Sequence, residues 1–424
     1  MEKRVIKSLI VEKQEEIRNI DLIERQLNLE DEVNYVFVGI RRAGKSYLLY
    51  QHIQHFIKSG QASIEDILYV NFEDERFSSV KADELNLFLE CYKELYDGKP
   101  LIFLDEIQNI DGWEKFVRRL ADSKYRVFVT GSNAKMLSKE IYTTLGGRFV
   151  AKEVFPFSFR EYLTFHHVEL CKNWEYGETR LQVVKLFHDY FYYGGFAEAF
   201  PLKDKRSWLT SLYQKVLLSD VIFRNDIRNE NAIKILVKKL AESVMQPTSL
   251  ARLKSIIDST GSTVARNTLV DYLQYLTDAY LVFGISNFSD KLSKKETFKK
   301  RYFFDNGLLN NFLFDPETKL LENIVAITLK KKYDEDLYFY NKNIEVDFFI
   351  PKEQRAIQVS YSLADEVTKQ REIKALMKLS EVHDIKNSEI VTWDEDYTIE
   401  ENGVLIKILP IWKWLICENR PAHW

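Results

Sequence analysis

Short apolar runs alternate with amphipathic segments over the first 155 residues of the chain. Four runs have the length and the β-branched or aromatic content of buried strands: 36–38, 67–70, 101–104 and 127–129. Between these runs, apolar residues at helical spacing predict helices, as in 46–57 and 113–121. Strands that alternate with helices predict an α/β fold, with a parallel sheet covered on both faces.

The pattern becomes mainly helical after residues 155–157 and remains so to residue 246. Pro247 and Thr248 then open a shorter unit, with two helices around a tight turn and two strands around a basic loop. This order of elements is typical of a winged helix-turn-helix. The remaining residues mix helices with short strands, which predicts a further α/β domain. The predicted domains are therefore 1–155, 156–246, 247–310 and 311–424.

The composition is that of an ordinary globular protein, with 46% hydrophobic and 29% charged residues in a chain of 424. A net charge of −4 gives no global basic field, so any contact with nucleic acid must come from a local patch. The three cysteines lie far apart, which excludes a zinc motif and a disulfide framework and fits the reducing cytoplasm. No apolar stretch has the length of a membrane helix. We therefore expect a cytoplasmic protein with no membrane partner.

Residues 39–46 read GIRRAGKS and match the P-loop pattern G-x-x-x-x-G-K-[ST], between a predicted strand and a predicted helix. Gly39 and Gly44 allow the backbone to approach phosphate oxygens, and Lys45 supplies positive charge to the β- and γ-phosphates. The Ser46 hydroxyl is a predicted Mg²⁺ ligand. Ala43 is assigned to the same site, and Arg41 and Arg42 are candidates there that equally fit surface arginines. The pattern predicts that the chain binds ATP together with Mg²⁺.

A second element of the same site follows the strand at 101–104, which ends in Asp105 and Glu106. A buried parallel strand that delivers an acid at its carboxyl end, beside a P-loop, is typical of a Walker B motif. We expect Asp105 to hold Mg²⁺, directly or through water. We expect Glu106 to be the base that orients the attacking water.

Further residues are candidates for contacts with the γ-phosphate. The strand at 127–129 is followed by small polar residues, and either Ser132 or Asn133 is a candidate sensor of that phosphate. Arg148 is a candidate to supply charge to the transition state, in cis or from a neighbouring subunit. It equally fits a surface arginine beside a loop. The sequence pattern does not decide between these roles for Arg148, nor between Ser132 and Asn133. It does not determine the oligomeric state either.

Several segments together resemble an AAA-like P-loop ATPase group that is abundant in bacteria and archaea. Those in the first part are GIRRAGKS (39–46), LIFLDEIQ (101–108), TGSNAKML (130–137), LGGRF (145–149) and EVFPFSFREYL (153–163). Those in the later part are YYGGFAEAF (192–200), YFFDNGLLN (302–310), LLENIVAITL (320–329), EVDFFI (345–350) and ILPIWKWLI (408–416). Members typically carry a C-terminal domain of unknown function with a winged helix and a restriction-endonuclease-like module. The resemblance implies ATP binding, ATP hydrolysis and association with DNA.

The predicted winged helix offers candidate DNA contacts. Arg266 and Asn267 begin its second helix, where side chains that read a DNA groove would lie. The predicted wing is rich in cations, and its candidates for phosphate contacts are Lys294, Lys295, Lys299 and Lys300. Winged helices also mediate protein contacts, and lysine-rich loops are often only solvated. A protein partner is therefore the alternative to DNA.

The C-terminal domain resembles the PD-(D/E)xK nucleases, which use a helix acid, a strand-end acid and an E-x-K strand to bind Mg²⁺ and activate water. The candidate acids are Glu322, Glu345 and Asp347. Gln358 and Ser360 occupy the E-x-K positions, and neither replaces the carboxylate or the lysine that the chemistry requires. We expect a degenerate nuclease site without nuclease activity, retained for binding or packing.

The leading hypothesis is an ATP-driven switch or motor whose C-terminal half engages DNA or a protein. One alternative is an ATP-regulated nuclease. Another is a signalling scaffold that binds nucleotide tightly and turns it over rarely.

Overall fold

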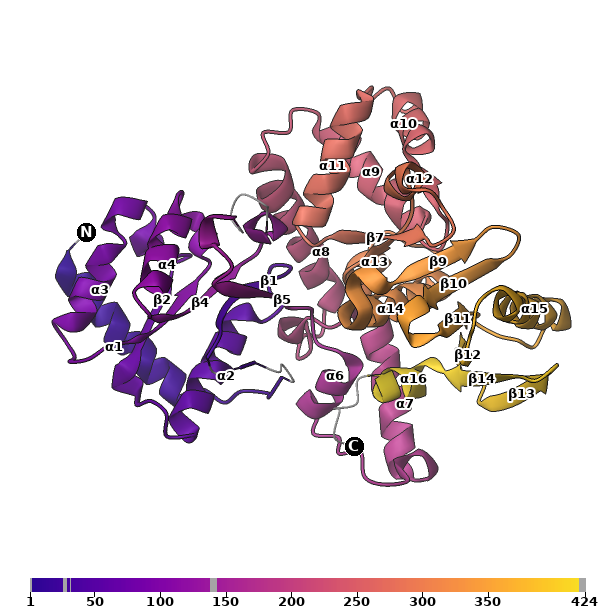
Figure 1. The fold of residues 1–424 in the computed structure, drawn as a ribbon, viewed down its shortest axis with the longest axis horizontal. Helices are drawn as coiled ribbons and strands as arrows, with labels where there is room; N and C mark the ends of the chain where they lie inside the picture. The colour runs from indigo at the N-terminus through magenta and orange to yellow at the C-terminus, as the bar shows by residue number, and fades with distance from the viewer. Residues whose placement is uncertain (1, 26–28, 31, 138–142, 419–424) are drawn as a thin grey trace. The chain divides into compact units, whose positions relative to one another are not determined.

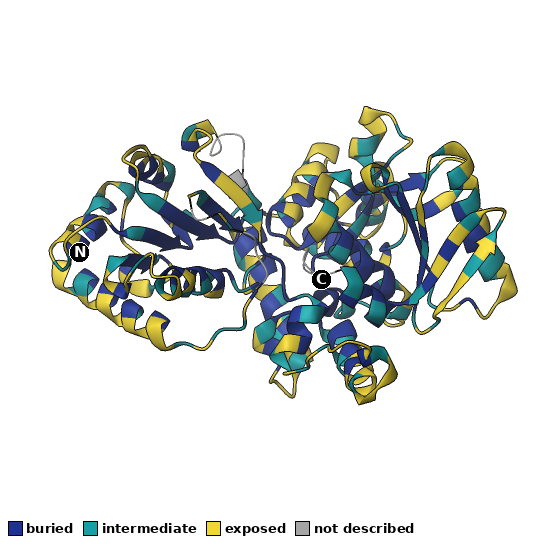
Figure 2. Ribbon diagram, turned by 60° about the horizontal axis from the view of Figure 1, so that its bottom comes forward, coloured by how far each residue is buried: buried dark blue, intermediate teal, exposed yellow. Residues whose placement is uncertain are grey.

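The computed structural model describes residues 2–25, 29–30, 32–137 and 143–418, within two compact units, Met1–Val154 and Phe155–Trp424 (Figure 1). Each unit contains its own β-sheet. Figure 2 shows that buried residues lie along most strands of both sheets. Within the described residues, no helix combines the length and the apolar character needed to cross a bilayer.

The sheet of the first unit is parallel, as the alternation of strands and helices predicts. In the described residues its strand order is β2-β3-β4-β1-β5, and every neighbouring pair is parallel. The strands are β1 (Asn34–Val38), β2 (Ile67–Asn71), β3 (Leu101–Asp105), β4 (Arg126–Gly131) and β5 (Phe149–Glu153). Nearly every residue of β1 to β4 is buried. Because successive side chains of a strand point to opposite faces, both faces of this sheet are covered.

Helices of the first unit pack on this sheet. They are α1 (Lys3–Asn19), α2 (Lys45–Lys58), α3 (Asn86–Lys93) and α4 (Trp113–Asp122). Helices α2 and α4 both contact β4, the central strand, and α1 contacts β2. Aromatic rings fill the centre, where Phe103 of β3 stacks on Phe128 of β4 with ring centroids 4.7 Å apart. This core fixes the strands whose ends carry the predicted site.

The second unit begins with helices. They are α6 (Phe159–Phe165), α7 (Glu178–Tyr193), α8 (Lys205–Lys215), its π-helical continuation η8 (Val216–Phe223) and α9 (Glu230–Glu242). Next come β6 (Thr248–Ser249), α10 (Leu250–Ser259), α11 (Arg266–Asp278), β7 (Val282–Asn287), α12 (Leu292–Thr297) and β8 (Phe298–Phe303). Strands β7 and β8 form an antiparallel hairpin, and β8 also pairs with β6. The basic segment expected to be a loop therefore contains the short helix α12.

The sheet of the second unit continues past the hairpin into the last part of the chain. The later elements are α13 (Asn306–Asn310), α14 (Glu317–Tyr333), β9 (Tyr338–Asn341), β10 (Glu345–Ile350), β11 (Arg355–Val359), α15 (Glu366–Val382), β12 (Asn387–Thr392), β13 (Tyr397–Glu401), β14 (Val404–Pro410) and α16 (Ile411–Glu418). In the described residues the strand order is β13-β14-β12-β11-β10-β9-β7-β8-β6. Because β7 pairs with β9, the predicted units 247–310 and 311–424 share one sheet.

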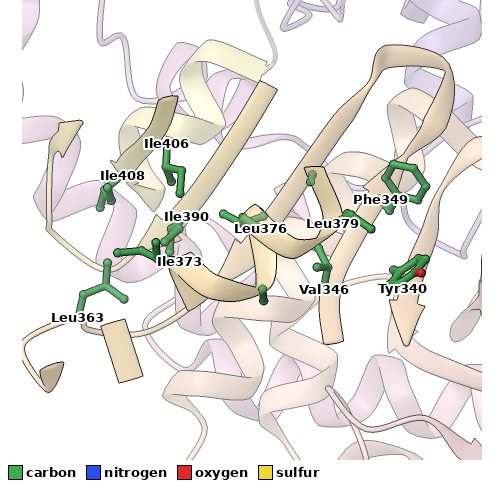
Figure 3. Packing of buried hydrophobic residues seen from close by; sticks show 12 residues of the cluster. Tyr340, Val346, Phe349, Leu363, Ile373, Leu376, Leu379, Ile390, Ile406 and Ile408 are labelled. Atoms are coloured by element: carbon green, nitrogen blue, oxygen red, sulfur yellow. The ribbon is translucent and has the colours of Figure 1, made fainter. Parts of the chain in front are cut away.

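An apolar cluster joins α15 to this sheet (Figure 3). Ile373, Leu376 and Leu379 follow helical spacing on one face of α15 and are buried. Their neighbours in the cluster come from the strands and include Tyr340, Val346, Phe349, Ile390, Ile406 and Ile408. The sequence pattern of α15 therefore encodes its packing face.

Leu376→Ala should destabilise the second unit by about 2–5 kcal/mol, because truncating a fully buried leucine loses its transfer free energy and leaves a cavity. Leu405→Ala is the matched control, since Leu405 is 51% exposed and should cost little. Denaturant unfolding followed by tryptophan fluorescence suits this test, because Trp113 is the one tryptophan that belongs to the first unit. Equal midpoints for the two variants would contradict the assigned core.

Candidate functional site

Three strands of the first unit end at the same edge of its sheet, and the predicted site residues follow those ends. The register pairs Val38 of β1 with Gly131 of β4, and Leu104 of β3 with Val129 of β4. Neighbouring parallel strands present their carboxyl ends at one edge, which is where α/β sheets bind ligands. The loop after β1, the acids after β3 and the polar residues after β4 are therefore neighbours.

The loop 39–44 joins β1 to α2 and requires glycine at both ends. Gly39 has φ +154°, and a Cβ atom there would lie 2.2 Å from the carbonyl oxygen of Val154. Gly44 has φ +89°, in the left-handed region that glycine adopts most easily. Within the turn, the N–H of Ala43 donates to the carbonyl oxygen of Ile40 at 3.2 Å. The loop leads directly to the N-terminus of α2, where the helix dipole favours an anion.

Lys45 is the first residue of α2, and its ammonium group is buried beside the loop. Its Nζ donates to the carbonyl oxygens of Gly39 at 3.1 Å and Ile40 at 3.2 Å. It also lies 3.5 Å from Oε1 of Glu106. The ammonium thus links the loop to the acids after β3, and a bound phosphate would compete with these oxygens for it.

Asp105, the last residue of β3, is fully buried and accepts hydrogen bonds from hydroxyl groups. Tyr69 of β2 donates to its Oδ2 at 2.6 Å, and Thr130 of β4 donates to its Oδ1. The Ser46 hydroxyl of α2 also hydrogen-bonds this carboxylate. Burial raises the pKa of Asp105, the charge of Glu106 raises it further, and the hydroxyl donors oppose the rise.

Glu106 has a left-handed backbone, with φ 51° and ψ 41°, which is unusual for a residue other than glycine. Its N–H donates to Oγ1 of Thr130 at 2.9 Å, and this bond holds the conformation. Burial opposes ionisation of the side chain, but the Lys45 ammonium lowers the pKa of Glu106 below its usual range. Glu106 is therefore an ionised acid at neutral pH. Its left-handed backbone is a second indication of a functional role, because strained backbone of this kind is concentrated at functional sites.

The polar residues after β4 lie beside Glu106. Ser132 and Asn133 are both buried. The Ser132 Oγ accepts a hydrogen bond from Nε2 of Gln108 at 3.4 Å, and Ser132 also hydrogen-bonds Glu106. Asn133 occupies the next position, where its carbonyl oxygen accepts from the N–H of Met136.

The two arginines within the loop differ in their surroundings. Nη1 of Arg41 pairs with Oε1 of Glu73, which follows β2, at 2.5 Å. The Arg41 charge also contributes to lowering the pKa of Glu106. Arg42 is exposed and adopts φ 64°.

Arg148 does not lie at this edge of the sheet, which corrects the option that it acts in cis. It precedes β5, and the register pairs Phe149 of β5 with Asn34, the first residue of β1. The five residues of β1 span roughly 16 Å at about 3.3 Å per residue, so the loop 39–44 lies at the opposite end of the strand. Arg148 pairs with Asp122 at 2.5 Å. Its action on a neighbouring subunit stays a prediction.

The structure adds residues to the site that sequence reasoning did not single out. Nε2 of Gln108 donates to Oε2 of Glu106 at 2.5 Å, so Gln108 orients the predicted base. Arg25 precedes β1 and is buried, and its Nη1 donates to the carbonyl oxygen of Ala43 at 2.9 Å. Tyr69 and Thr130 hold Asp105. A polar residue two places after an acidic strand end was a usable signal for Gln108, whereas Arg25 lies in no recognisable motif.

The donor set fits Mg²⁺. Ser46 and Asp105 supply hard oxygen atoms that are close enough to hydrogen-bond one another. Mg²⁺ is typically held by one or two carboxylates together with substrate phosphates and water, not by an all-protein cage. The described residues contain no group of three or more acidic, histidine or cysteine side chains that could hold a metal by themselves.

The candidate DNA contacts of the second unit are only partly exposed. Arg266 and Asn267 are exposed at the start of α11, as expected. Lys294 pairs with Asp290 at 2.9 Å and Lys299 with Glu296 at 3.2 Å, whereas Lys295 lies over the rings of Phe288 and Tyr338. Lys300 is fully buried on β8, so its assignment to DNA is wrong. Side chains alternate along a strand, and Lys300 points into the unit.

The predicted degenerate nuclease residues come together around this buried lysine, with one exception. Lys300 contacts Glu322, Glu345 and Asp347. Oε1 of Gln358 accepts from the N–H of Asp347 at 2.8 Å, which brings it into the same cluster. Ser360 instead donates to the carbonyl oxygen of Ser362 at 3.0 Å and does not join the cluster through that contact.

Comparison with family models gives two matches. A model described as an AAA domain matches residues 31–163, which confirms the expected AAA-like P-loop domain. A model described as a domain of unknown function matches residues 184–319. The second description names no activity, so the winged-helix and nuclease-like character of the later residues stays a prediction.

Relatives with sequence similarity include two uncharacterized proteins. One, from Methanocaldococcus jannaschii, is 35% identical over 431 residues, covering 97% of this chain and 94% of the relative. The other, from Haemophilus influenzae, is 30% identical over 343 residues, covering 78% of this chain and 83% of the relative. Among solved structures, the Aeropyrum pernix ORC1 protein in complex with DNA is 14% identical, covers 70% of this chain and 88% of that chain, and has a TM-score of 0.28. That score is too low to support an argument about function.

Proposed function

The chain belongs to the same family as the uncharacterized Methanocaldococcus jannaschii protein and carries an AAA domain, and we propose that it is an Mg²⁺-dependent ATPase that uses hydrolysis to switch conformation. The observation that carries the proposal is the contact of Lys45 with Glu106 and of Ser46 with Asp105 at one edge of a parallel sheet. These contacts join a phosphate-binding loop to two acids with different environments.

In the proposed site the loop 39–44 and the start of α2 bind the phosphates, with Lys45 as the buried charge and with Arg41 and Arg42 beside it. Ser46 and Asp105 hold Mg²⁺, which offsets the charge of the β- and γ-phosphates when it is bound. Three hydroxyl groups already hold the Asp105 carboxylate in place. Little rearrangement is then needed for it to act as a ligand.

Glu106 is the proposed general base. Its lowered pKa keeps the carboxylate ionised, and its contacts with Lys45 and Gln108 limit its orientation. We favour Ser132 over Asn133 as the residue that senses the γ-phosphate, because Ser132 hydrogen-bonds both Gln108 and Glu106. Arg148 lies at the far end of β1, so any catalytic role for it requires a neighbouring subunit.

Association with DNA is the second part of the proposal, and it rests on the cations around the β7–β8 hairpin. Lys291 and Lys294 are exposed on or beside α12, and Arg266 is exposed on α11. Lys294 and Lys299 already form local ion pairs with Asp290 and Glu296. Breaking these pairs would offset some of the binding free energy that contacts with DNA phosphates supply. A slow-turnover scaffold would use the same nucleotide site and differ only in rate.

Lys45→Ala should abolish ATP binding without unfolding the first unit, since Lys45 is the fixed charge proposed to face the phosphates. Titration calorimetry with ATP and Mg²⁺ measures the loss. Lys58→Ala is the control, because Lys58 is exposed at the other end of α2. Unchanged affinity in a folded Lys45→Ala variant would rule out the assigned site.

Glu106→Gln should bind ATP normally but hydrolyse it about 10²–10⁴-fold more slowly, because an amide cannot take up the proton of the attacking water. Gln108→Met keeps the side-chain volume and removes the hydrogen bond to Glu106, so kcat should fall by a smaller factor with KM nearly unchanged. Steady-state phosphate release measures both variants. Wild-type turnover in Glu106→Gln would leave Glu106 with a structural role only.

If the hairpin contacts DNA, changing Lys294, Lys295 and Lys299 to Glu should weaken binding and flatten its salt dependence. Each lost phosphate contact removes a slope of about 0.9 in log K against log salt. The charge-matched control changes the exposed Lys203, Lys342 and Lys386 to Glu. The hairpin is not the site if both triple variants have the same slope.

A further inference from the structure

The second unit contains a fully buried lysine surrounded by three carboxylates. Lys300 lies on β8, and its Nζ is 2.8 Å from Oδ1 of Asp347, 3.3 Å from Oε1 of Glu345 and 3.4 Å from Oε1 of Glu322. The acids come from α14 and β10, and two of them are 22 and 47 residues away in sequence. An isolated buried ammonium is strongly unfavourable, so these acids are what permits Lys300 in the core.

The cluster does not fit the Mg²⁺ that a nuclease resemblance implies. Carboxylate oxygens that ligate Mg²⁺ lie about 2.0–2.1 Å from the ion, whereas an ammonium group makes hydrogen bonds near 2.8 Å. Here the oxygens surround Nζ at hydrogen-bond and ion-pair distances. No set of three such ligands that could hold a metal is found among the described residues. The position at the centre of the acids is filled by the chain's own cation.

Donors of the same unit add further hydrogen bonds to the cluster. The Tyr302 hydroxyl donates to Oε1 of Glu322 at 2.6 Å. The N–H of Val359 donates to Oδ2 of Asp347 at 3.0 Å. Gln358 donates from Nε2 to Oε2 of Glu372 at 2.7 Å and accepts from the N–H of Asp347. Both polar groups of Gln358 are thus used to hold neighbours, which is a structural role at the position of a nuclease carboxylate.

Lys300 also connects two parts of the sheet, which meet where β7 pairs with β9 and where Asn287 hydrogen-bonds Asn341. The pairing of β7 with β9 covers two residue pairs, Ser286 with Tyr338 and Asn287 with Phe339. Lys300 belongs to β8 on one side of this junction, and Asp347 belongs to β10 on the other side. Their contact spans the junction and supports it with a buried ion pair.

We propose that Lys300 is the permanent internal cation of this module, in the place where a nuclease would hold a divalent metal, and that it fastens the β7–β8 hairpin to the C-terminal sheet. The module then requires no metal. Its acids are retained because they neutralise Lys300, and they do not activate water.

The test compares wild type with Lys300→Met, which keeps an unbranched apolar stem and removes the ammonium. Breaking a buried ion pair on one side leaves uncompensated charge, so the melting temperature of the second unit should fall by roughly 5–15 °C. Lys300→Met/Asp347→Asn removes one charge of each sign and should recover part of this loss. Lys299→Met is the matched control, because Lys299 is the preceding residue of β8 and pairs only with the exposed Glu296 in the described contacts.

Metal dependence is measured in the same series without nucleotide, by melting followed through tryptophan fluorescence and by Mn²⁺ binding followed through electron paramagnetic resonance. The wild-type second unit should show no stabilisation by Mn²⁺ or Mg²⁺, whereas Lys300→Met should gain stability from Mn²⁺, which replaces the lost charge.

Two results would overturn the proposal. One is Mn²⁺ binding by wild type that Asp347→Asn abolishes. The other is a Lys300→Met variant as stable as Lys299→Met. If Lys300→Met does not fold, the wild-type titration still decides whether the acids hold a metal.

Discussion

The parallel register of β3, β4 and β1 is the constraint on which the proposed nucleotide site depends. Val38 lies beside Gly131, and Leu104 lies beside Val129, so three strand ends converge at one edge. The acids reach that edge because β3 is buried along its length and has one favourable register. A shift by one residue would turn Asp105 away from Ser46 and Tyr69. The site is therefore a consequence of core packing, and the loop 39–44 adds the phosphate-binding turn to it.

Both units bury charge, and they do so by different means. In the first, Asp105 is held mainly by neutral hydroxyl groups, which leaves its negative charge available to a cation. In the second, Lys300 is surrounded by acids that neutralise it. The first arrangement suits exchange of a ligand, because the charge is not yet compensated. The second suits a permanent structural role, because every partner belongs to the fold and removing Lys300 leaves the buried acids without their cation.

These two arrangements of buried charge suit different roles for the two units. The proposed nucleotide chemistry belongs to the first unit, where the loop 39–44, the proposed Mg²⁺ ligands and the proposed base meet. In the second unit the acids around Lys300 fasten the hairpin to the sheet, and Gln358 is engaged in holding Asp347 and Glu372. An ATPase that acts as a switch needs a site that changes with the bound nucleotide and another part whose conformation stays fixed. The two charge arrangements match these two requirements.

The sequence by itself determined the parallel α/β character of the first unit, the P-loop pattern, and the position of two acids directly after a buried strand. These features are local, since strand burial, glycine conformation and the loop-to-helix junction depend on residues adjacent in the chain. Tertiary structure alone decided that Arg148 lies at the far end of β1, that Lys300 faces inward, and that β7 joins β9. Those outcomes depend on strand register and on contacts between distant segments. Local patterns do not specify such contacts, because pairing across a sheet is selected by the packing of the whole core.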